Sequence, residues 1–462
     1  MAGSVTVESK IMVGAVVTMD SGARALACIV MAGGKGTRMR SALPKVLHAT
    51  CGRPILGWVL EAARAAGASR LVVVTPPDAD EVRELLPADA IAAIQPEARG
   101  TGDAVRCGVE ALGDFDGDVL VVSGDTPLIR GSLLRDVVSS HRDGRAVATL
   151  LTAHVPPPNG YGRVVRDPNG SVDHVVEAGD ASPAILAITE INTGFYAFDA
   201  GALRDALARL RPNNVQGELY LPDVLPILRE GRGHIVGHLT ADVVSTMGVN
   251  TRVDLAAAER FMRLRLLEAH MLAGAGIVDP ESTFVEHGVV LEPDCTIHPF
   301  TVLRGATRVC SGAQVGPHAV LVDAEVGEGA TIGPFCYLRP GARLATNAKA
   351  GTFVEIKNSN VGEGAKVPHL SYIGDADIGA GTNIGAGTIT ANYHAGKKHR
   401  TTIGAHVHTG SDNVFVAPVT IGDDAYTGAG SIITDDVPDG ALGMARARQV
   451  NIDGYARRSD DG

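Results

Sequence analysis

The chain has 462 residues, of which 45% are hydrophobic and 56 are glycine, and its formal net charge is −11. This hydrophobic content excludes wholesale disorder, and the acidic balance without a long basic cluster excludes an extended nucleic-acid-binding surface. The length predicts about three domains of roughly 150 residues each. Glycine is well above its usual ~7%, which indicates a part of the chain that turns tightly and repeatedly.

The N-terminus and the cysteines bear on the compartment. No apolar run reaches the ~18 residues of a membrane-spanning helix, so we expect no membrane association. The apolar run at residues 11–19 lacks the basic start of a signal peptide, and we expect residues 1–24 to form a flexible extension. The six cysteines form no CxxC pair, which predicts reduced thiols in a cytoplasmic protein.

From residue 25 to about 252, short apolar runs alternate with helical patterns. Strands are expected at residues 27–31, 71–74 and 119–122, and helices at 56–66 and 80–86. This alternation predicts an α/β, Rossmann-like domain with a mostly parallel sheet over residues 25–252. Ligands of such domains bind beyond the carboxyl ends of the strands.

A helix expected at residues 253–275 is interpreted as a linker between domains, because its apolar residues recur with helical period and two glycines end it. From residue 276 to 462 the pattern has a six-residue period instead. Its aliphatic positions are Val285, Leu291, Ile297, Leu303, Val309, Val315, Leu321, then Val326, Ile332, Leu338, Leu344, then Val361, Val367, Ile373, Ile378 and Ile384, and late in the chain Phe415, Ile421 and Ile433, with Thr427 between them. This period predicts a parallel β-helix of hexapeptide repeats, whose handedness the period does not determine.

The six-residue phase breaks at residues 351–360 and again at 390–400. Insertions in such a coil form loops on one face, often the binding face, so we expect the chemistry of this half there. A β-helix that serves purely as a scaffold is the alternative.

A glycine-rich run at residues 33–39 directly follows the first expected strand. Glycine lets backbone N–H groups approach a phosphate or a base closely. The spacing fits neither the dinucleotide fingerprint nor a Walker loop, because Arg38 comes two residues after Gly36 and Lys45 follows Pro44. Arg38 and Lys45 together would neutralise a triphosphate and the departing pyrophosphate. A glycine-rich turn with solvated cations fits the same residues.

Two further positions of this half have ligand chemistry. Asp125 follows the strand at residues 119–122, where a carboxylate is well placed to hold Mg²⁺ against phosphates, although capping a turn is the commoner role. Gln95 and the backbone of residues 100–102 would contact a base, with an ordinary turn as the alternative.

In the C-terminal half, His369 is a candidate general base. Glu355 would orient or polarise it. Arg339, Lys357 and Tyr372 would bind an anionic sugar phosphate. A structural or solvated histidine is the alternative on the residues alone.

The motifs and their order resemble one known family. The N-terminal signature is Gly33-Gly34-Lys35-Gly36-Thr37-Arg38-Met39 with Leu43-Pro44-Lys45-Val46-Leu47-His48. The supporting N-terminal motifs are Gly100-Thr101-Gly102, Gly124-Asp125-Thr126-Pro127-Leu128-Ile129, Gly160-Tyr161-Gly162-Arg163, Glu190-Ile191-Asn192-Thr193-Gly194, Gln216-Gly217-Glu218 and Gly248-Val249-Asn250. The C-terminal motifs are Glu355-Ile356-Lys357, His369-Leu370-Ser371-Tyr372, Asn383-Ile384-Gly385-Ala386-Gly387-Thr388, Ala391-Asn392-Tyr393 and Gly410-Ser411. From about residue 25 to 457, the chain resembles the sugar-1-phosphate nucleotidyltransferases, and more narrowly the bifunctional N-acetylglucosamine-1-phosphate uridyltransferases/glucosamine-1-phosphate N-acetyltransferases.

The resemblance implies two activities. The β-helix, left-handed in this family, would acetylate glucosamine-1-phosphate with acetyl-CoA as co-substrate. The N-terminal domain would then couple N-acetylglucosamine-1-phosphate to UTP with Mg²⁺ and release pyrophosphate. The product would be UDP-N-acetylglucosamine, a precursor of peptidoglycan and other envelope glycans, and the family's homotrimers share acetyltransferase sites between neighbours.

The resemblance also implies residue roles. Asp125 and Asn250 would bind Mg²⁺, and Arg38 and Lys45 would contact the triphosphate. Substrates of the uridyl transfer would further be bound by Met31, Ala32, Gly33 and Gly34, the uracil by Gln95, Gly100 and Thr101, and the amino sugar by Gly162, Glu177 and Asn192. In the acetyltransferase, His369 would be the general base and Asn383 and Tyr372 would position the sugar. The acetyl-CoA groove would be lined by Ala386, Asn392, Tyr393, Ser411, Ala429 and Arg446.

The chain departs from the family's pattern at a few positions. Ala32-Gly33-Gly34 stands where the family usually has Ala-Ala-Gly, Ser123 replaces a common Tyr, and Asp103 replaces a common His. Ala178-Gly179 replaces a usual His-Lys pair, which removes a cation near the sugar. These departures bear on sugar affinity and rate rather than on the reaction.

Two rival functions remain for comparison. One is a sugar-1-phosphate nucleotidyltransferase with a purely structural β-helix, against which intact Glu355, Lys357, His369, Asn383 and Ser411 argue. The other is a non-catalytic sensor of sugar nucleotides, against which intact Arg38, Lys45, Asp125 and Asn250 argue.

Overall fold

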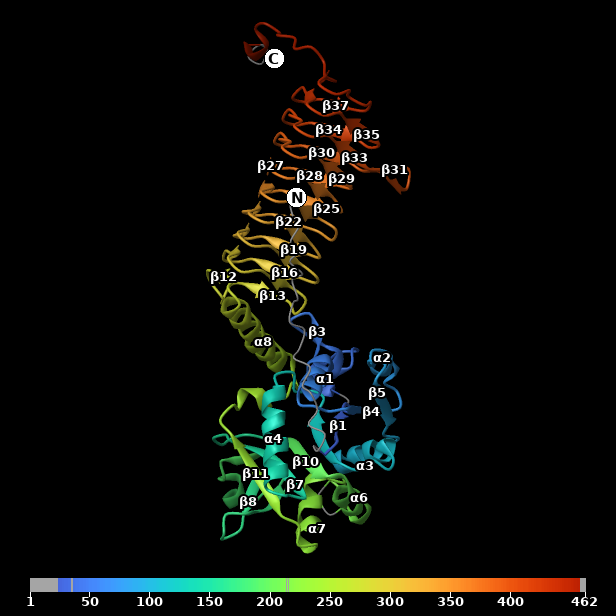
Figure 1. Ribbon diagram of the computed structural model, residues 1–462, viewed down its shortest axis with the longest axis vertical. Coiled ribbons are helices and arrows are strands. Elements are labelled where there is room, and N and C mark those ends of the chain that lie inside the picture. The colour runs from blue at the N-terminus through green and yellow to red at the C-terminus, as the bar shows by residue number, and fades with distance from the viewer. Residues whose placement is uncertain (1–23, 35, 213, 215, 458–462) are drawn as a thin grey trace, which may run out of the picture. The chain divides into compact units, whose positions relative to one another are not determined.

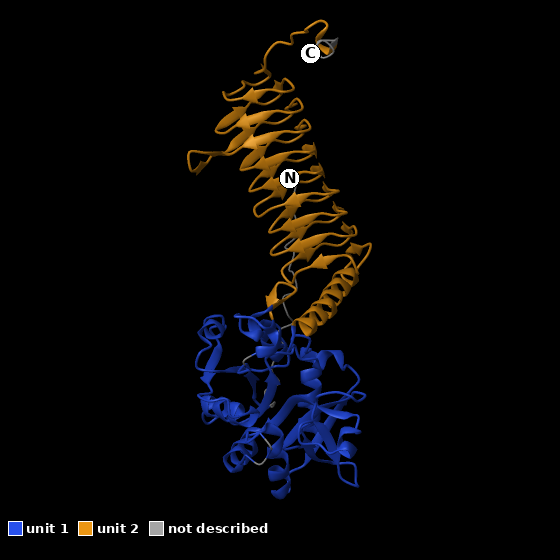
Figure 2. Cartoon of the chain, turned by 180° about the vertical axis from the view of Figure 1, so that it is seen from behind, with its two compact units in different colours: residues 1–48, 55–251 blue, residues 49–54, 252–462 orange. Residues whose placement is uncertain are grey.

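The computed structural model describes residues 24–457 except residues 35, 213 and 215. It divides into two compact units (Figure 2). Unit 1 contains the chain up to His48 and Ile55–Thr251, and unit 2 contains Ala49–Pro54 and the chain from Arg252 onward. The expected extension at residues 1–23 lies outside the described residues. Arg24, which we grouped with it, is anchored, because its guanidinium donates to Asp118 at 3.1 Å and to Asp199 at 2.6 Å.

Unit 1 is built on one mixed sheet (Figure 1). The strands in spatial order are β11 (Ile235–Thr240), β7 (Ala148–His154), β10 (Glu190–Asp199), β6 (Asp118–Ser123), β1 (Leu26–Met31), β4 (Arg70–Thr75) and β5 (Ala90–Ile94). Along this order the pairs are parallel except those that β10 makes with β6 and β7. The antiparallel β8 (Arg163–Arg166) and β9 (Val172–Val176) branch from β10. The expected α/β domain with a mostly parallel sheet is confirmed.

Helices cover both faces of this sheet because its strands are apolar on both sides. Val72, Val73 and Val74 of β4 are fully buried, although consecutive side chains point to opposite faces. One core joins the sheet to α3 (Thr101–Leu112), α6 (Ala200–Arg209) and α7 (Val224–Glu230). The other joins it to α1 (Ile55–Ala65), α2 (Asp80–Glu84) and α4 (Gly131–Asp143). The short α5 (Pro183–Leu186) precedes β10.

Unit 2 begins with α8 (Arg252–Leu272), at the position where a linker helix is expected. A two-stranded hairpin, β2 (Ala49–Thr50) and β3 (Arg53–Pro54), belongs to this unit despite its early place in the chain. The amide of Cys51 in its turn donates to Glu259 of α8 at 2.6 Å, and the Cys51 carbonyl accepts from His287 at 2.9 Å. Among the described residues, no helix of either unit has the length and apolarity needed to cross a bilayer.

The rest of unit 2 is a parallel β-helix with three sheets, in which successive coils add strands to each (Figure 1). The first sheet contains β12 (Gly276–Ile277), β15 (Thr296–Ile297), β18 (Gln314–Val315), β21 (Thr331–Ile332), β24 (Lys349–Thr352) and β27 (Lys366–His369). The second contains β13 (Phe284–Val285), β16 (Val302–Arg304), β19 (Val320–Val322), β22 (Tyr337–Leu338), β25 (Glu355–Lys357), β28 (Tyr372–Gly374), β30 (Ile389–Ala391), β34 (Val414–Val416) and β37 (Ile432–Ile433). The third contains β14 (Val290–Leu291), β17 (Arg308–Val309), β20 (Glu325–Val326), β23 (Arg343–Leu344), β26 (Asn360–Val361), β29 (Ala376–Ile378), β33 (Thr401–Ile403) and β35 (Val419–Ile421). Late in the chain β36 (Tyr426–Thr427) pairs with β38 (Leu442–Gly443).

All the side chains of the six-residue pattern are buried inside this coil, from Val285 at one end to Ile433 at the other. They stack in a single core because each parallel neighbour pair keeps its register, as in Leu303↔Leu321 and Leu321↔Leu338. The expected fold, a left-handed parallel β-helix of hexapeptide repeats, is confirmed.

The break expected at residues 351–360 is wrong. Ala350 and Ile356 are both fully buried and continue the inward positions, so β24, β25 and β26 follow one another without an insertion. A small alanine at an inward position and a five-residue step from Ile356 to Val361 concealed the repeat.

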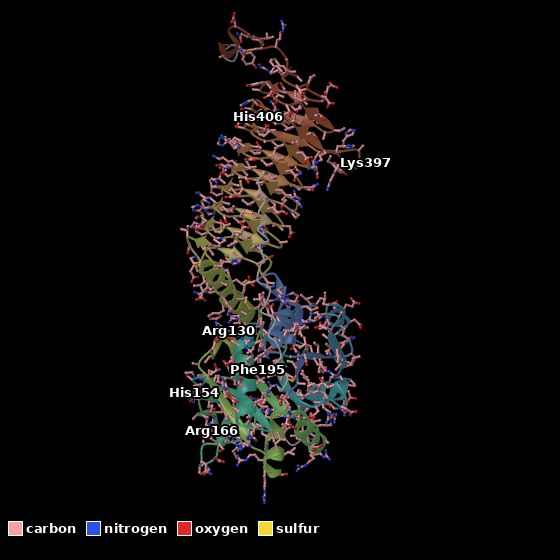
Figure 3. All side chains as sticks on the ribbon, viewed as in Figure 1. Arg130, His154, Arg166, Phe195, Lys397 and His406 are labelled. Atoms are coloured by element: carbon pink, nitrogen blue, oxygen red, sulfur yellow. The ribbon has the colours of Figure 1, made fainter. Side chains whose placement is uncertain are left out.

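The second expected break, at residues 390–400, is a true insertion. Thr390 is still fully buried, and the chain then leaves the coil as a hairpin of β31 (Tyr393–His394) and β32 (Lys397–Lys398) before it re-enters at β33. Figure 1 shows β31 projecting from the coil, and Figure 3 labels Lys397 at the outer end of this projection.

Candidate functional sites

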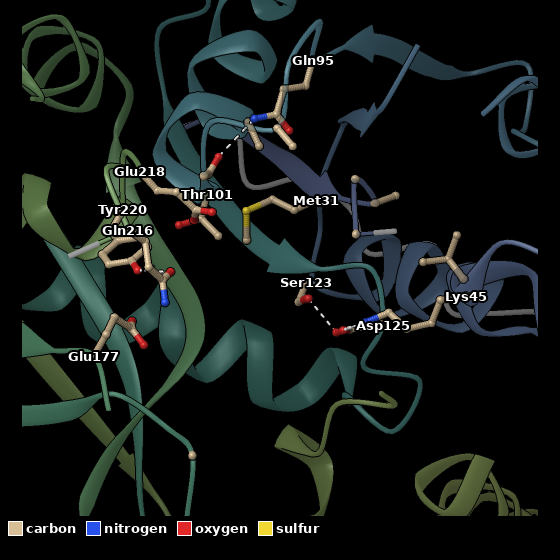
Figure 4. Close-up of a pocket in the computed structure, with 18 of the residues that line it drawn as sticks. Met31, Lys45, Gln95, Thr101, Ser123, Asp125, Glu177, Gln216, Glu218 and Tyr220 are labelled. Carbon is tan, nitrogen blue, oxygen red and sulfur yellow. Dashed lines mark hydrogen bonds and ion pairs between the residues drawn. The ribbon is translucent and has the colours of Figure 1, made fainter. Parts of the chain in front are cut away.

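Unit 1 holds a pocket of about 570 Å³ at the carboxyl ends of β1 and β6 (Figure 4). The expected residues that line it are Met31, Ala32, Gly33, Gly34, Lys45, Gln95, Gly100, Thr101, Asp125 and Glu177. Other lining residues, to which the sequence assigned no direct role, are Val46, Ala98, Ala104, Ser123, Gly160, Ala178, Gly179, Gln216, Glu218 and Tyr220. The position agrees with the rule that ligands bind beyond the carboxyl ends of parallel strands.

The glycine-rich run turns tightly enough to place Lys45 against the pocket. Gly36 has a φ of +57°, and a Cβ on it would lie 2.9 Å from the Cβ of Lys45. A larger residue at position 36 would therefore be strained and would displace this lysine. Short 3-10 turns at Thr37–Met39 and Lys45–Leu47 carry the two expected cations.

Four expected residues meet at one end of the pocket through Asn250 and Asp125. The Lys45 ammonium donates to the Asp125 carboxylate and, at 3.2 Å, to Oδ1 of Asn250 (Figure 4 draws the Lys45–Asp125 pair). The Arg38 guanidinium donates to the same Asn250 oxygen at 3.0 Å. Ser123 donates its hydroxyl to the other oxygen of Asp125 at 2.6 Å, a contact that the sequence did not predict.

Residues for a divalent cation are present at this end. Asp125 and Asn250 both present an oxygen to one ammonium nitrogen, so the two oxygens lie within reach of a single cation. Magnesium is commonly held by one or two protein oxygens together with water and substrate phosphates, and this pair fits that need. Among the described residues there is no cluster of three or more His, Cys, Asp or Glu suited to a metal.

Gln95 and Gly100 lie at another end of the pocket, 3.1 Å apart from the side-chain nitrogen to the carbonyl oxygen. Gly100 has a φ of +107°, and a Cβ on it would lie 2.5 Å from the Leu219 carbonyl oxygen, so glycine is required. Thr101 begins α3 and its hydroxyl oxygen accepts from the Leu221 amide at 2.9 Å. Toward the pocket this end offers the Gln95 amide and backbone groups, and the Asp103 carboxylate accepts a hydrogen bond from Gln95.

The expected sugar-binding residues lie together across the pocket from Lys45. A Cβ on Gly162 would lie 3.1 Å from a carboxylate oxygen of Glu177, and the Gly162 carbonyl accepts from the Asn192 amide at 2.8 Å. Burial raises the pKa of Glu177, and repulsion from Asp223 and Asp180 raises it further. Four expected residues are not among those that line the pocket. Gly162 and Asn250 contact the lining residues Glu177 and Lys45, and Asn192 and Arg38 contact Gly162 and Asn250 in turn.

In unit 2, His369 ends β27 and is exposed at the corner between the first and second sheets. The expectation that Glu355 orients it is not met within one chain. The Glu355 carboxylate accepts instead from Arg339 at 2.8 Å, and among the described residues the His369 imidazole has no hydrogen-bond partner. Backbone bonds hold the corner, since Gly387 donates to the His369 carbonyl at 3.3 Å.

Asp375 lies at the next corner, between the second and third sheets, and binds several side chains there. It was not among the residues predicted from the sequence. Its buried carboxylate accepts from Lys357 at 3.2 Å, from Asn358 at 2.6 Å and from Asn392. Burial alone would raise the pKa of Asp375, but these hydrogen bonds outweigh it and hold the pKa below its ordinary value. The sequence offered little indication of this role, because Asp375 contacts its partners only when successive coils stack.

The candidate acetyl-CoA residues are divided between these two corners. Ala386 and Ser411 belong to the first corner, where their carbonyls accept from Asp412 at 2.7 Å and Gly430 at 2.8 Å. Ala429 precedes Gly430, and a Cβ on Gly430 would lie 4.0 Å from Cδ of Arg446. Asn392 and the exposed Tyr393 lie at the second corner, beside Asp375 and on the projecting hairpin.

Tyr372 and Asn383 are placed differently. Tyr372 opens β28 of the second sheet, and its hydroxyl lies 2.5 Å from a Cβ placed on Gly374, toward Asn392. Asn383 continues the first sheet by pairing with Lys366 and His408. A single chain therefore does not bring all the expected acetyltransferase residues into one cavity.

Known proteins resemble this chain both in its N-terminal domain and over nearly its whole length. Residues 28–212 match a family model described as a MobA-like NTP transferase domain. The chain is 50% identical to the bifunctional protein GlmU of Streptomyces avermitilis, with 96% of each chain covered. It is 48% identical to that of Thermobifida fusca over 96% of each chain, and 46% identical to that of Mycolicibacterium vanbaalenii over 95% of this chain and 94% of the relative.

The fold and the pocket define a nucleotidyltransferase unit joined to a hexapeptide-repeat β-helix. The near-complete coverage by relatives narrows this class. The chain belongs to the family of bifunctional GlmU proteins. It is a bifunctional transferase of UDP-N-acetylglucosamine biosynthesis, with a uridyltransferase and an acetyltransferase activity.

Proposed function

We propose that the pocket of unit 1 transfers the uridyl group of UTP to N-acetylglucosamine-1-phosphate. A phosphate oxygen of the sugar phosphate attacks the α-phosphorus, and the bond to the departing pyrophosphate breaks. The observation that carries this proposal is the meeting of Lys45, Asp125, Asn250 and Arg38 at one end of the pocket. The attacking phosphate is already anionic at neutral pH, so positioning and electrostatics carry catalysis without a general base.

Different residues of the pocket would bind the phosphates, the uracil and the amino sugar. Arg38 and Lys45 contact the triphosphate and stabilise the charge that develops on the departing pyrophosphate. Gln95, Gly100 and Thr101 bind the uracil. At the other end Glu177 binds the amino sugar, with Gly162 and Asn192 behind it.

Asp125 and Asn250 would hold Mg²⁺ beside the phosphates. The ion, when bound, neutralises phosphate charge. Ser123 donates to the Asp125 oxygen that does not face Lys45, and it thereby keeps the other oxygen directed toward the cation-binding end.

We propose that the β-helix acetylates glucosamine-1-phosphate before the uridyl transfer. His369 would take a proton from the glucosamine amine as the nitrogen attacks the thioester carbonyl of acetyl-CoA, and the carbon–sulfur bond then breaks to release CoA. Arg339 and Lys357 would bind the sugar phosphate, and Tyr372 and Asn383 would position the sugar. Ala386, Asn392, Tyr393, Ser411, Ala429 and Arg446 would line the acetyl-CoA groove.

This acetyltransferase would be completed between copies of the chain in a homotrimer. Two features support it, namely the His369 imidazole without a partner in the described part of the chain and the division of the acetyl-CoA residues between two corners. A third is the outer face of the second sheet, which carries more large apolar residues than the outer faces of the other two sheets and is interrupted by Arg304, Glu355 and Lys357. Its outward residues include Phe284, Val302, Val320, Tyr337, Ile389, Val414 and Ile432.

We further propose a cytoplasmic location and domain limits of 25–252, 253–275 and 276–462. The substrates, UTP and acetyl-CoA among them, are cytoplasmic metabolites. The unit boundary at Thr251 and Arg252 supports the first limit, with the hairpin at Ala49–Pro54 assigned to the β-helix unit.

The test incubates the purified protein with glucosamine-1-phosphate, acetyl-CoA, UTP and Mg²⁺ and omits each component in turn. CoA should appear without UTP or Mg²⁺, whereas pyrophosphate should appear only when UTP, Mg²⁺ and the acetylated sugar phosphate are all present. Pyrophosphate release without CoA release under any condition would instead support a purely structural β-helix.

Two substitutions assign the activities to their sites. Asp125→Ala should lower pyrophosphate release by about 10²-fold or more and spare CoA release, because the charge-stabilising end of the pocket is lost. His369→Ala should lower CoA release by about 10²- to 10⁴-fold and spare uridyl transfer. The matched controls are Asp116→Ala and His406→Ala, at exposed positions outside both sites, which should change neither activity. Equal loss of both activities in either site variant would contradict independent sites.

A further inference from the structure

Gln95 is held in one orientation at the base-binding end of the pocket. It follows β5, is 7% exposed, and its amide nitrogen donates to the Gly100 carbonyl at 3.1 Å and to Oδ2 of Asp103 at 3.0 Å. Figure 4 draws the first of these bonds as a dashed line from the Gln95 nitrogen. The side-chain oxygen of Gln95 lies 3.3 Å from a Cβ placed on Gly33, which lines the pocket.

The chemistry of the two partners decides which way the amide faces. A carbonyl and an ionised carboxylate only accept hydrogen bonds, so the group that faces them must be the amide NH₂. The opposite orientation would set the Gln95 oxygen against two acceptors. The Gln95 oxygen is therefore left as the group presented toward a bound base.

Asp103 is itself supported by a second partner. It is 3% exposed on α3, and its other oxygen, Oδ1, accepts from Arg106 one helical turn along. Each carboxylate oxygen thus has a different donor, and Arg106 compensates the buried charge. The Asp103 carboxylate can only accept a hydrogen bond from Gln95.

We propose that Asp103 is a positioning residue that makes the pocket select a pyrimidine with a protonated N3. The Gln95 oxygen accepts from the N3–H of uracil, whereas N3 of cytosine is an acceptor and would meet another acceptor there. The proposal rests on the proposed function, in which Gln95 contacts the base. Discrimination by a buried hydrogen-bonding group of this kind is large, because the wrong base leaves the group unpaired.

Asp103→Asn tests the proposal because Arg106 fixes which way the introduced amide faces. Arg106 only donates, so it takes the oxygen of the introduced amide and turns the new NH₂ toward Gln95. In its present orientation the Gln95 NH₂ would then face another NH₂ group. In the flipped orientation the Gln95 oxygen would face the Gly100 carbonyl oxygen. Neither orientation is favoured, and the preference for UTP over CTP should fall by about 10- to 100-fold.

The double variant Asp103→Asn with Arg106→Met is the matched rescue. Without the guanidinium, the oxygen of the introduced amide is free to face the Gln95 nitrogen, so the UTP preference should return toward that of the starting protein. Arg106→Met alone keeps the carboxylate and should leave the preference nearly unchanged. A purely structural role of Asp103 would instead make the double variant at least as impaired as the single one.

The readouts are the equilibrium binding of UTP and CTP and the kcat/KM ratio for the two nucleotides, with CoA release as the check that the protein is folded. A smaller UTP/CTP ratio in Asp103→Asn, restored in the double variant, supports the proposal. An unchanged ratio in Asp103→Asn with intact CoA release overturns it. Failure of the starting protein to turn over UTP would count against the proposed function instead, and the binding ratio would still decide the role of Asp103.

Discussion

Single residues in these sites act through the charges around them, and Glu177 shows this most clearly. It lies half-buried, close to Asp180 and Asp223, and the two residues that follow it, Ala178 and Gly179, carry no charge. Burial and the neighbouring carboxylates raise the pKa of Glu177. The folded state therefore binds a proton at Glu177 more tightly than the unfolded chain does.

The sign of this shift leads to a prediction. Stability from a raised carboxyl pKa is present at low pH and is lost as the pH rises through the folded-state pKa, so ionised Glu177 destabilises the fold at neutral pH. Glu177→Gln should raise the melting temperature of unit 1 at pH 7, and the gain should vanish as the pH falls below the ordinary range of a glutamate. The same variant should raise the KM for N-acetylglucosamine-1-phosphate about tenfold, through loss of a charge-assisted hydrogen bond.

Melting curves at several pH values and initial rates check this prediction, with the exposed Glu81→Gln as the control. A lower melting temperature at pH 7 for Glu177→Gln would show that its carboxylate is stabilising, contrary to the direction of the pKa shift.

At this scale the sequence predicted the motif residues better than their neighbours. Arg38, Lys45 and Asp125 stand in or beside runs that are recognisable by spacing, and the structure brings them together. Asp375 was missed because its partners come from neighbouring coils, 17 or 18 residues away in the chain. The role assigned to Glu355 rested on closeness in sequence to the expected break, and the structure pairs it with Arg339 instead.

The elements of the β-helix owe their stability to stacking rather than to their own length, since many strands have two residues. A two-residue strand has no stability alone, and each coil is held by its neighbours. Leu321 of β19 is fully buried between Leu303 and Leu338 of the adjoining coils, so it contributes to both interfaces.

Leu321→Ala should therefore lower the free energy of unfolding of unit 2 by about 2–5 kcal/mol, the usual cost of a large-to-small change in a packed core. The exposed Glu328→Ala in the same unit is the control and should change it little. Denaturant unfolding followed by circular dichroism measures the effect, with uridyl transfer as the marker for unit 1. A cost below about 1 kcal/mol would show that the coil relaxes around the missing side chain.

For the whole molecule, the apolar outer face of the second sheet determines what surrounds the β-helix. Ile389 and Ile432 are 43% and 56% exposed on this face, whereas the first sheet presents Gln314, Lys349 and Lys366 outward. Exposed apolar side chains gathered on one face of a coil are typical of a surface that pairs with another chain. The proposed homotrimer would bury it.

A charge on this face tests the assembly. Ile432→Glu should lower the native mass from three chains to one, because an unpaired carboxylate in an apolar interface is costly. Gln314→Glu on the polar face is the matched control and should leave the mass unchanged. Light scattering gives the mass, and CoA release should fall with dissociation while uridyl transfer persists. Native mass of a single chain for the unaltered protein would contradict the trimer.

The amino-acid sequence by itself determined the two fold classes, the approximate limits of the regular elements and the motif residues of the uridyl-transfer pocket. It did so because inward-facing periodicity and glycine-rich turns are local properties that a few consecutive residues express. The tertiary structure decided which side chains meet: Asn250 with Arg38 and Lys45, Asp375 with Lys357 and Asn392, and Ala49–Pro54 with the β-helix unit. These contacts join residues distant in the chain, and only the packing of strands, coils and helices into one register brings such residues within hydrogen-bond distance.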